Sequence, residues 1–204
     1  MSKPLVIFSH GKESGPQGSK IQALMAIAQR HGAQVMSVDY REHPKGTFHN
    51  QNAPDEADRR VAQLVNTPRP EHLKLILVGS SMGGYVSTVA SHQLEVDGLF
   101  LMAPAFYLPG YSEQEPLLRA KTTLVVHGWN DEVVPVRNSI KFAQKNLCEL
   151  HLLNADHRLN GVLPQIERLF EMFLQQAWTG AGLCGTDSNP ARQLESNEII
   201  AHNR

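Results

Sequence analysis

Residues 73–83 read LKLILVGSSMG, and this stretch decides the fold of the chain. The apolar run at 73–78 predicts a buried strand, and the Gly-x-Ser-x-Gly pattern at 79–83 predicts a sharp turn into a helix. Glycines two positions before and after Ser81 allow a turn that holds its side chain up at the end of a sheet, as the first residue of the helix. We interpret Ser81 as a nucleophile; the alternative is a glycine-rich turn in which Ser81 only caps the helix.

Length and charge narrow the class of protein. At 204 residues the chain is long enough for one well-buried α/β domain and short for two. The net charge is −1 and the basic residues are scattered, so we expect no nucleic-acid partner. The longest apolar runs fall far short of a membrane span, and the run after Pro4 is too short for a signal peptide. We therefore expect a cytoplasmic protein with no membrane partner.

Short β-branched runs alternate with longer segments of helical period along the chain. Strands are expected at 4–9, 34–39, 73–79, 98–102, 122–127 and 148–153. Helices are expected at 18–31, 54–66, 82–94, 137–146 and 162–177. Because most of the strands are apolar throughout, they predict an α/β fold with a doubly wound, mostly parallel six-stranded sheet covered by helices on both faces. One domain is expected over 1–178, followed by a polar tail over 179–204.

Two polar loops supply partners for a nucleophilic serine. Such a serine needs a base to accept its proton and a carboxylate to orient that base. Asp131 follows the strand expected at 122–127, and His157 follows the strand expected at 148–153. Because the carboxyl ends of parallel strands meet at one edge of the sheet, these groups are predicted to converge on Ser81. Asp156 is a rival for the acid, but adjacent side chains rarely face each other, so Asp131 is favoured.

The motifs in these loops resemble those of a known superfamily. Residues 127–135 read His-Gly-x-x-Asp-x-x-Val-Pro, and Asp156, His157 and Leu159 form an Asp-His-x-Leu loop. With the order Ser, Asp, His, the chain from 4 to about 177 resembles the α/β-hydrolase superfamily, and within it the small lidless serine esterases and dienelactone-hydrolase-like members. The resemblance implies a three-layer αβα sandwich. Dienelactone hydrolase itself has a cysteine where Ser81 stands, so its substrate is not carried over.

The same resemblance predicts an oxyanion hole. The strand expected at 4–9 is followed by His10, Gly11 and Lys12, similar to the family's His-Gly-x loop. Two backbone N–H groups, those of Lys12 and Met82, are expected to bind the oxyanion. Lys12 is therefore expected to act through its main chain, with its ammonium group in solvent.

The remaining histidines and the cysteines are expected to be structural. We predict that His10 supports the oxyanion loop and that His127 is a satisfied core histidine beneath the acid loop. His43 and His49 lie in a polar loop without ligands at a suitable spacing, so no metal site is expected. The two cysteines lie in different settings, and neither a disulfide framework nor a cysteine metal site is expected; they are Cys148, in a predicted buried strand, and Cys184, in the tail.

Two aromatic residues are candidates for binding substrate. Phe106 and Trp129 follow strands at the catalytic end, where they either wall the acyl pocket or pack in the ordinary way. The segment 102–122 must cross the sheet face, which leaves no room for a helical lid.

The expected function is that of a serine hydrolase. Its substrate would be a small carboxylic ester or thioester, cleaved through an acyl-enzyme intermediate without a cofactor. The alternative is a non-catalytic protein of the same fold that binds a small acid or a protein partner. The sequence leaves the acyl group, the leaving group and the oligomeric state open.

Overall fold

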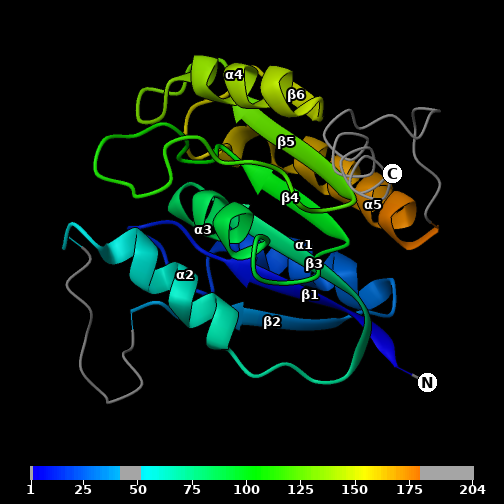
Figure 1. Cartoon of the computed structure of the whole chain (residues 1–204). Coiled ribbons are helices and arrows are strands. Elements are labelled where there is room, and N and C mark those ends of the chain that lie inside the picture. The colour runs from blue at the N-terminus through cyan, green and yellow to red at the C-terminus, as the bar shows by residue number, and fades with distance from the viewer. Residues whose placement is uncertain (1, 42–51, 180–204) are drawn as a thin grey trace, which may run out of the picture.

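The computed structural model describes residues 2–41 and 52–179, which form a sheet between two layers of helices (Figure 1). The strands are β1 (Lys3–Ser9), β2 (Gln34–Val38), β3 (His72–Ser80), β4 (Gly98–Met102), β5 (Thr122–Gly128) and β6 (Glu149–Leu153). They pair in parallel throughout, in the order β2-β1-β3-β4-β5-β6. This arrangement confirms the predicted six-stranded, doubly wound sheet.

The helices divide between the two faces of the sheet. They are α1 (Ser19–Arg30), α2 (Glu56–Asn66), α3 (Met82–Ala90), α4 (Val136–Asn146) and α5 (Leu163–Thr179), with a 3₁₀ turn, η1, at Asn160–Val162. The buried side chains of α1 and α5 form one core cluster, and those of α2, α3 and α4 form the other. In β3, Ile76 and Val78 enter the first cluster while Leu75 and Leu77 enter the second. The apolar run therefore serves both cores, which is why it does not alternate with polar residues.

Some boundaries differ from the sequence prediction. Helix α3 ends at Ala90 instead of residue 94, because the N–H groups of His92 and Gln93 donate only three residues back, to the carbonyls of Val89 and Ala90, and form a turn. Cys148 lies before β6 and is only partly buried, which corrects its expected place inside a buried strand. Apart from Thr179, which ends α5, the predicted tail lies outside the described residues.

The topology places the site. The chain leaves β1 for β2 on one side and then returns to β3 on the other side of β1, so connections diverge between β1 and β3. Crevices at the carboxyl ends of such neighbouring strands are the usual binding positions in open α/β sheets. Both strands end beside Ser81, since Ser9 pairs with Gly79. No helix within 2–41 and 52–179 is long and apolar enough to cross a membrane.

Candidate active site

Ser81 occupies a strained turn between β3 and α3. Its backbone has φ 55° and ψ −121°, in a region that residues other than glycine seldom adopt. The turn is held by the Ser81 N–H, which donates to the Met102 carbonyl at 2.9 Å, and by the Ala105 N–H, which donates to the Ser81 carbonyl at 3.0 Å. Ser81 precedes the helix instead of beginning it, and its side chain makes no capping hydrogen bond. Ser81 therefore does not cap the helix through its hydroxyl, which was the alternative interpretation.

The flanking glycines are required by close packing. A Cβ atom at Gly79 would lie 2.3 Å from the carbonyl oxygen of Gly83. A Cβ atom at Gly83 would lie 2.0 Å from the carbonyl oxygen of Ser9, at the end of β1. A larger residue at Gly79 would separate β3 from the start of α3, and a larger residue at Gly83 would push the start of α3 away from β1. Both glycines therefore keep the turn tight.

Ser81, His157 and Asp131 form a continuous hydrogen-bonded chain. His157 Nε2 lies 3.0 Å from Ser81 Oγ, and His157 Nδ1 lies 2.7 Å from Asp131 Oδ2. A carboxylate only accepts hydrogen bonds, so Nδ1 carries the hydrogen and Nε2 is left to accept the serine proton. The Asp131 side chain is fully buried, whereas that of His157 is 19% exposed. The base thus lies at the surface of the site and the acid behind it.

Two backbone N–H groups and two histidine rings hold the Asp131 carboxylate in place. Its Oδ1 accepts hydrogen bonds from the N–H groups of Val133 at 2.9 Å and Val134 at 2.8 Å. Its Oδ2 lies 3.0 Å from His127 Nε2 in addition to His157 Nδ1. The rival acid, Asp156, instead accepts a hydrogen bond from the Leu159 N–H at 3.0 Å and closes its own turn.

His127 is a core histidine, as predicted, but its contact with the acid was missed. The ring is fully buried, and burial lowers the pKa of His127. Its Nε2 lies 3.0 Å from the Val134 carbonyl and its Nδ1 lies 2.7 Å from Ser139 Oγ. A carbonyl only accepts, so Nε2 carries the hydrogen and also faces Asp131. The spacing of four residues between His127 and Asp131 was the only sequence signal for this contact.

The loop after β1 lies against Ser81. A Cβ atom at Gly11 would lie 3.4 Å from the Cβ of Ser81, so the loop passes beside the serine with about the space of a methyl group between them. Met82 is the first residue of α3, where backbone N–H groups have no acceptor within the helix. The two predicted oxyanion donors, Lys12 and Met82, therefore belong to segments that border the serine from two sides.

Lys20 is a second group that the sequence did not single out. Its Nζ donates to the carbonyl of Arg158 at 2.6 Å, which ties the start of α1 to the residue after His157. Burial lowers the pKa of Lys20 to about 8, against the opposing effect of Asp156 and Asp131. Nothing in the pattern around Lys20 distinguished it from a solvated helical lysine.

The two predicted substrate-binding aromatics fall in different environments. Phe106 is fully buried and stacks on Phe142 with ring centroids 4.1 Å apart. This packing agrees with the ordinary role that the sequence analysis left open for Phe106, and its place in the wall of an acyl pocket stays a prediction. Trp129 is 54% exposed, and its backbone N–H donates to the Leu153 carbonyl at 2.8 Å, which links the acid loop to the end of β6. Its contact with substrate stays a prediction.

No metal site emerges from the part of the chain that the structure describes. No group of three or more His, Cys, Asp or Glu side chains within 2–41 and 52–179 is arranged to hold a metal ion. His43 and His49, which the sequence analysis considered, lie outside the described residues.

Comparisons with known proteins agree with the fold. The sequence model of the Hydrolase_4 family, described as serine aminopeptidase, S33, matches residues 1–161. A structure from Xanthomonas campestris pv. campestris, described as a hydrolase of the α/β superfamily, is 29% identical with a TM-score of 0.73, covering 86% of this chain and 99% of that chain. A comparison of the sequence with curated proteins found no match.

Two more distant structures share the fold alone. Est1E from Butyrivibrio proteoclasticus is 17% identical with a TM-score of 0.70, covering 87% of this chain and 89% of that chain. An α/β serine hydrolase without lid from Xanthomonas campestris is 22% identical with a TM-score of 0.67, covering 86% of this chain and 83% of that chain. Together with the family model, these similarities confirm the resemblance to the α/β-hydrolase superfamily and the fold class that the sequence predicted.

Proposed function

The chain belongs to the Hydrolase_4 family, serine aminopeptidase S33, and is a hydrolase; from this premise we propose that it is a serine hydrolase with Ser81 as nucleophile. Its substrate is a small carboxylic ester or thioester, and the reaction passes through an acyl-enzyme. The observation that carries the proposal is the hydrogen-bonded chain from Ser81 Oγ through His157 to Asp131. No metal or organic cofactor takes part.

The reaction has two halves. His157 Nε2 accepts the hydroxyl proton as Ser81 Oγ attacks the carbonyl carbon, and the carbonyl oxygen becomes an oxyanion. The imidazolium then donates its proton to the leaving alcohol or thiol, and the acyl group stays on Ser81. A water molecule, deprotonated by His157, then attacks the acyl-enzyme. The bond from the acyl carbon to Ser81 Oγ breaks, the imidazolium returns its proton to Oγ, and the acid is released. Asp131 holds the imidazole in the required tautomer throughout and stabilises its charged form.

The oxyanion is bound by two main-chain donors. The proposed donors are the N–H of Met82, directly after the nucleophile, and the N–H of Lys12, in the loop that lies beside Ser81. Donors of this kind cost about 3 kcal/mol of barrier each when they are removed, because they are already aimed where charge develops.

The acyl chain of the substrate is expected to be short. The connection from β4 to β5, residues 103–121, contains no helix and so supplies no lid over the site. An open site gives a long acyl chain little surface to bury, and each buried CH₂ would contribute about 0.8 kcal/mol. The hydrolysis rate of p-nitrophenyl esters should therefore peak at short acyl chains. A steady rise in kcat/KM to palmitoyl esters would contradict this.

A fluorophosphonate probe tests the proposal directly, because it labels only an activated serine. The wild-type chain should be labelled and Ser81→Ala should not be, while both keep the same circular dichroism spectrum. If neither protein is labelled and no acyl ester, acyl thioester or methyl ester is turned over, the non-catalytic binding protein becomes the better interpretation. Aminoacyl p-nitroanilides belong in the same screen, since the family model is named for aminopeptidases.

A further inference from the structure

The carbonyl oxygen of Gly11 is surrounded by donors. His10 Nδ1 lies 2.7 Å from it, Arg60 Nη1 donates to it at 3.2 Å and Ser14 Oγ donates to it at 3.4 Å. A carbonyl oxygen has two lone pairs, so three donors are more than this oxygen needs to be satisfied. Such crowding holds the direction of the Gly11 carbonyl from several sides.

His10 is a permanent donor in this arrangement. Its Nε2 accepts a hydrogen bond from the Tyr40 N–H at 3.1 Å, so the hydrogen of the neutral ring is on Nδ1. The ring is fully buried, and burial lowers the pKa of His10, which favours this neutral form. The ring therefore donates to the Gly11 carbonyl whenever the fold is intact.

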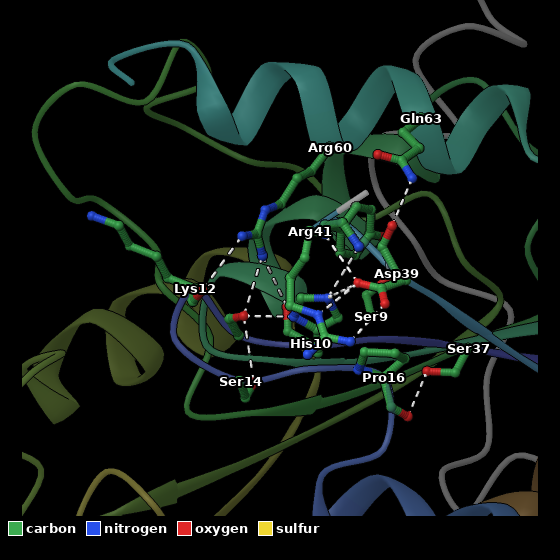
Figure 2. A network of polar contacts seen from close by, with 12 residues as sticks. Ser9, His10, Lys12, Ser14, Pro16, Ser37, Asp39, Arg41, Arg60 and Gln63 are labelled. Carbon is green, nitrogen blue, oxygen red and sulfur yellow. Dashed lines mark hydrogen bonds and ion pairs between the residues drawn. The ribbon is translucent and has the colours of Figure 1, made fainter. Parts of the chain in front are cut away.

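Arg60 brings a charge to the same place from a different element. It extends from α2 toward the loop that carries His10 and Lys12, whose own side chain points away (Figure 2). Arg60 is 1% exposed and its Nε donates to Glu56 Oε1 at 2.6 Å, so the buried guanidinium is neutralised from its own helix. The guanidinium carbon lies 5.1 Å from the centre of the Tyr40 ring, which supports the same group from another side.

The guanidinium contacts the carbonyls of three successive residues. Besides Gly11, Arg60 Nη1 lies 3.4 Å from the His10 carbonyl and Nη2 lies 3.5 Å from the Lys12 carbonyl. These are trans peptides, in which the C=O and N–H groups point in opposite directions. The N–H of Lys12 shares its peptide with the Gly11 carbonyl and is therefore turned away from Arg60. Successive N–H groups turned to one side form a concave anion site, and this loop lies beside Ser81, whose Cβ would be 3.4 Å from a Cβ at Gly11.

We propose that Arg60, held by Glu56, is a positioning residue that aims the Lys12 N–H at the oxyanion. This inference rests on the proposed serine-hydrolase function. Arg60 touches no reacting atom and acts through the peptide between Gly11 and Lys12. It orients that peptide through the carbonyl, and by polarising the carbonyl it makes the N–H a stronger donor. The planar fork of an arginine is needed, because a lysine supplies the charge without reaching adjacent carbonyls in one plane.

The test compares Arg60→Lys with Arg69→Lys. Arg69 is a matched control, because its Nη1 donates to the carbonyls of Leu64, Val65 and Thr67 at 3.3, 3.1 and 3.1 Å, at the far end of α2 from Arg60. Both substitutions remove an arginine fork from a group of main-chain carbonyls and keep the charge. Of these two arginines, Arg60 faces the loop beside Ser81 and Arg69 does not.

Arg60→Lys should lower kcat at least about tenfold with little change in KM, because the donor it orients acts in the transition state. The Ki of a trifluoromethyl ketone, whose adduct carries an oxyanion, should rise by a similar factor. Arg69→Lys should keep the kcat and Ki of the wild type even where its melting temperature falls. Each kcat is divided by the fraction of sites that a fluorophosphonate titrates, so partial unfolding does not count as lost catalysis.

A wild-type kcat per titrated site in folded Arg60→Lys would overturn the inference, and so would equal losses in the two variants. If Arg60→Lys does not fold, the double variant Glu56→Gln with Arg60→Gln removes both buried charges together and is measured in the same way. Failure of the proposed function looks different. In that case the wild-type chain itself is neither labelled nor active, whatever the Arg60 variants do.

Discussion

Two His-Gly pairs, His10-Gly11 after β1 and His127-Gly128 at the end of β5, occur at the same edge of the sheet and serve different purposes. Both histidines are fully buried, and burial lowers the pKa of His10 and of His127. We call the two pairs the β1 corner and the β5 corner. In the β1 corner, His10 carries its hydrogen on Nδ1 and donates it to a main-chain carbonyl. In the β5 corner, His127 carries its hydrogen on Nε2 and faces a carboxylate.

The glycines of the two corners differ as well. A Cβ atom at Gly128 would lie 2.3 Å from the Ala155 carbonyl oxygen and 2.7 Å from that of Asp156. A Cβ atom at Gly11 would meet nothing closer than 3.4 Å. The β5 corner is thus packed against the loop that carries His157, whereas the β1 corner leaves room beside Ser81. The same dipeptide therefore supports a reacting side chain in the β5 corner and main-chain donors in the β1 corner.

The largest effect should come from the β5 corner, where the acid lies. Asp131→Asn is expected to lower kcat by about 10⁴-fold, because an amide favours the wrong tautomer of His157. The measurement is the turnover of a short p-nitrophenyl ester by purified variants with unchanged circular dichroism. Asp156→Asn is the control, since Asp156 only closes its own turn, and it should retain most of the activity. The reverse result would make Asp156 the acid.

The next largest effect should come from substitution of the two glycines, which should be more damaging in the β5 corner than in the β1 corner. Gly128→Ala forces the backbone at 155–156 to shift and so displaces His157, a movement that costs about 10²-fold in kcat when it approaches 1 Å. It should also lower the free energy of unfolding by about 1–3 kcal/mol through overpacking. Gly11→Ala should lower the unfolding free energy by less, because its Cβ makes ordinary contacts. Urea denaturation and steady-state kinetics measure both; equal destabilisation would contradict the packing difference.

Substitutions of the two histidines should then differ in whether their effect on kcat depends on Asp131. His127→Phe removes a hydrogen bond from the acid, and its effect on kcat, about tenfold, should shrink in an Asp131→Asn background. His10→Phe acts on the oxyanion loop instead, so its effect on kcat should be the same with or without Asp131→Asn. A double-mutant cycle on kcat decides this. Coupling of His10 to Asp131 as strong as that of His127 would show that the corners are not independent.

The smallest effect is a pH dependence of stability that the corners share. Burial lowers the folded-state pKa of His10 and of His127 below the ordinary value of 6.5. The unfolded chain therefore binds more protons than the folded chain once the pH falls through 6.5, and the free energy of unfolding decreases from there down to the folded pKa values. Each histidine contributes a slope of at most about 1.4 kcal/mol per pH unit.

Urea denaturation between pH 7.5 and 5 measures this slope. The carboxyl groups with lowered pKa values, such as Asp39 beside Arg41, lose their stabilising effect only at lower pH. His10→Gln and His127→Gln should each flatten the slope, whatever they do to the stability at neutral pH. A slope that survives both substitutions would assign the pH dependence to other groups.

Much of the architecture could be predicted, because local pattern and topology agree. The apolar runs predicted β1 and β4 to within a residue, since strands covered on both faces leave little room for polar side chains. The C-terminal end of α3 was missed, because the backbone changes to three-residue turns after Ala90 while the helical pattern of the sequence continues. The sequence left two roles open for Phe106, because burial depends on what packs above a residue, here Phe142 from α4.

The sequence by itself determined the order of Ser81, Asp131 and His157 and the strand after which each comes. Parallel strands carry their carboxyl ends to one edge, so this order alone predicted that the three would meet. The sequence favoured Asp131 over Asp156 as the acid, because adjacent side chains rarely face each other. Only the tertiary structure showed that the Asp131 carboxylate reaches His157 while that of Asp156 closes its own turn. It also decided the hydrogen positions on His10 and His127 and the contact of Arg60 with a loop some 50 residues away. A hydrogen bond depends on where two chain segments cross in space, and that crossing exists only once the sheet and its helices have assembled.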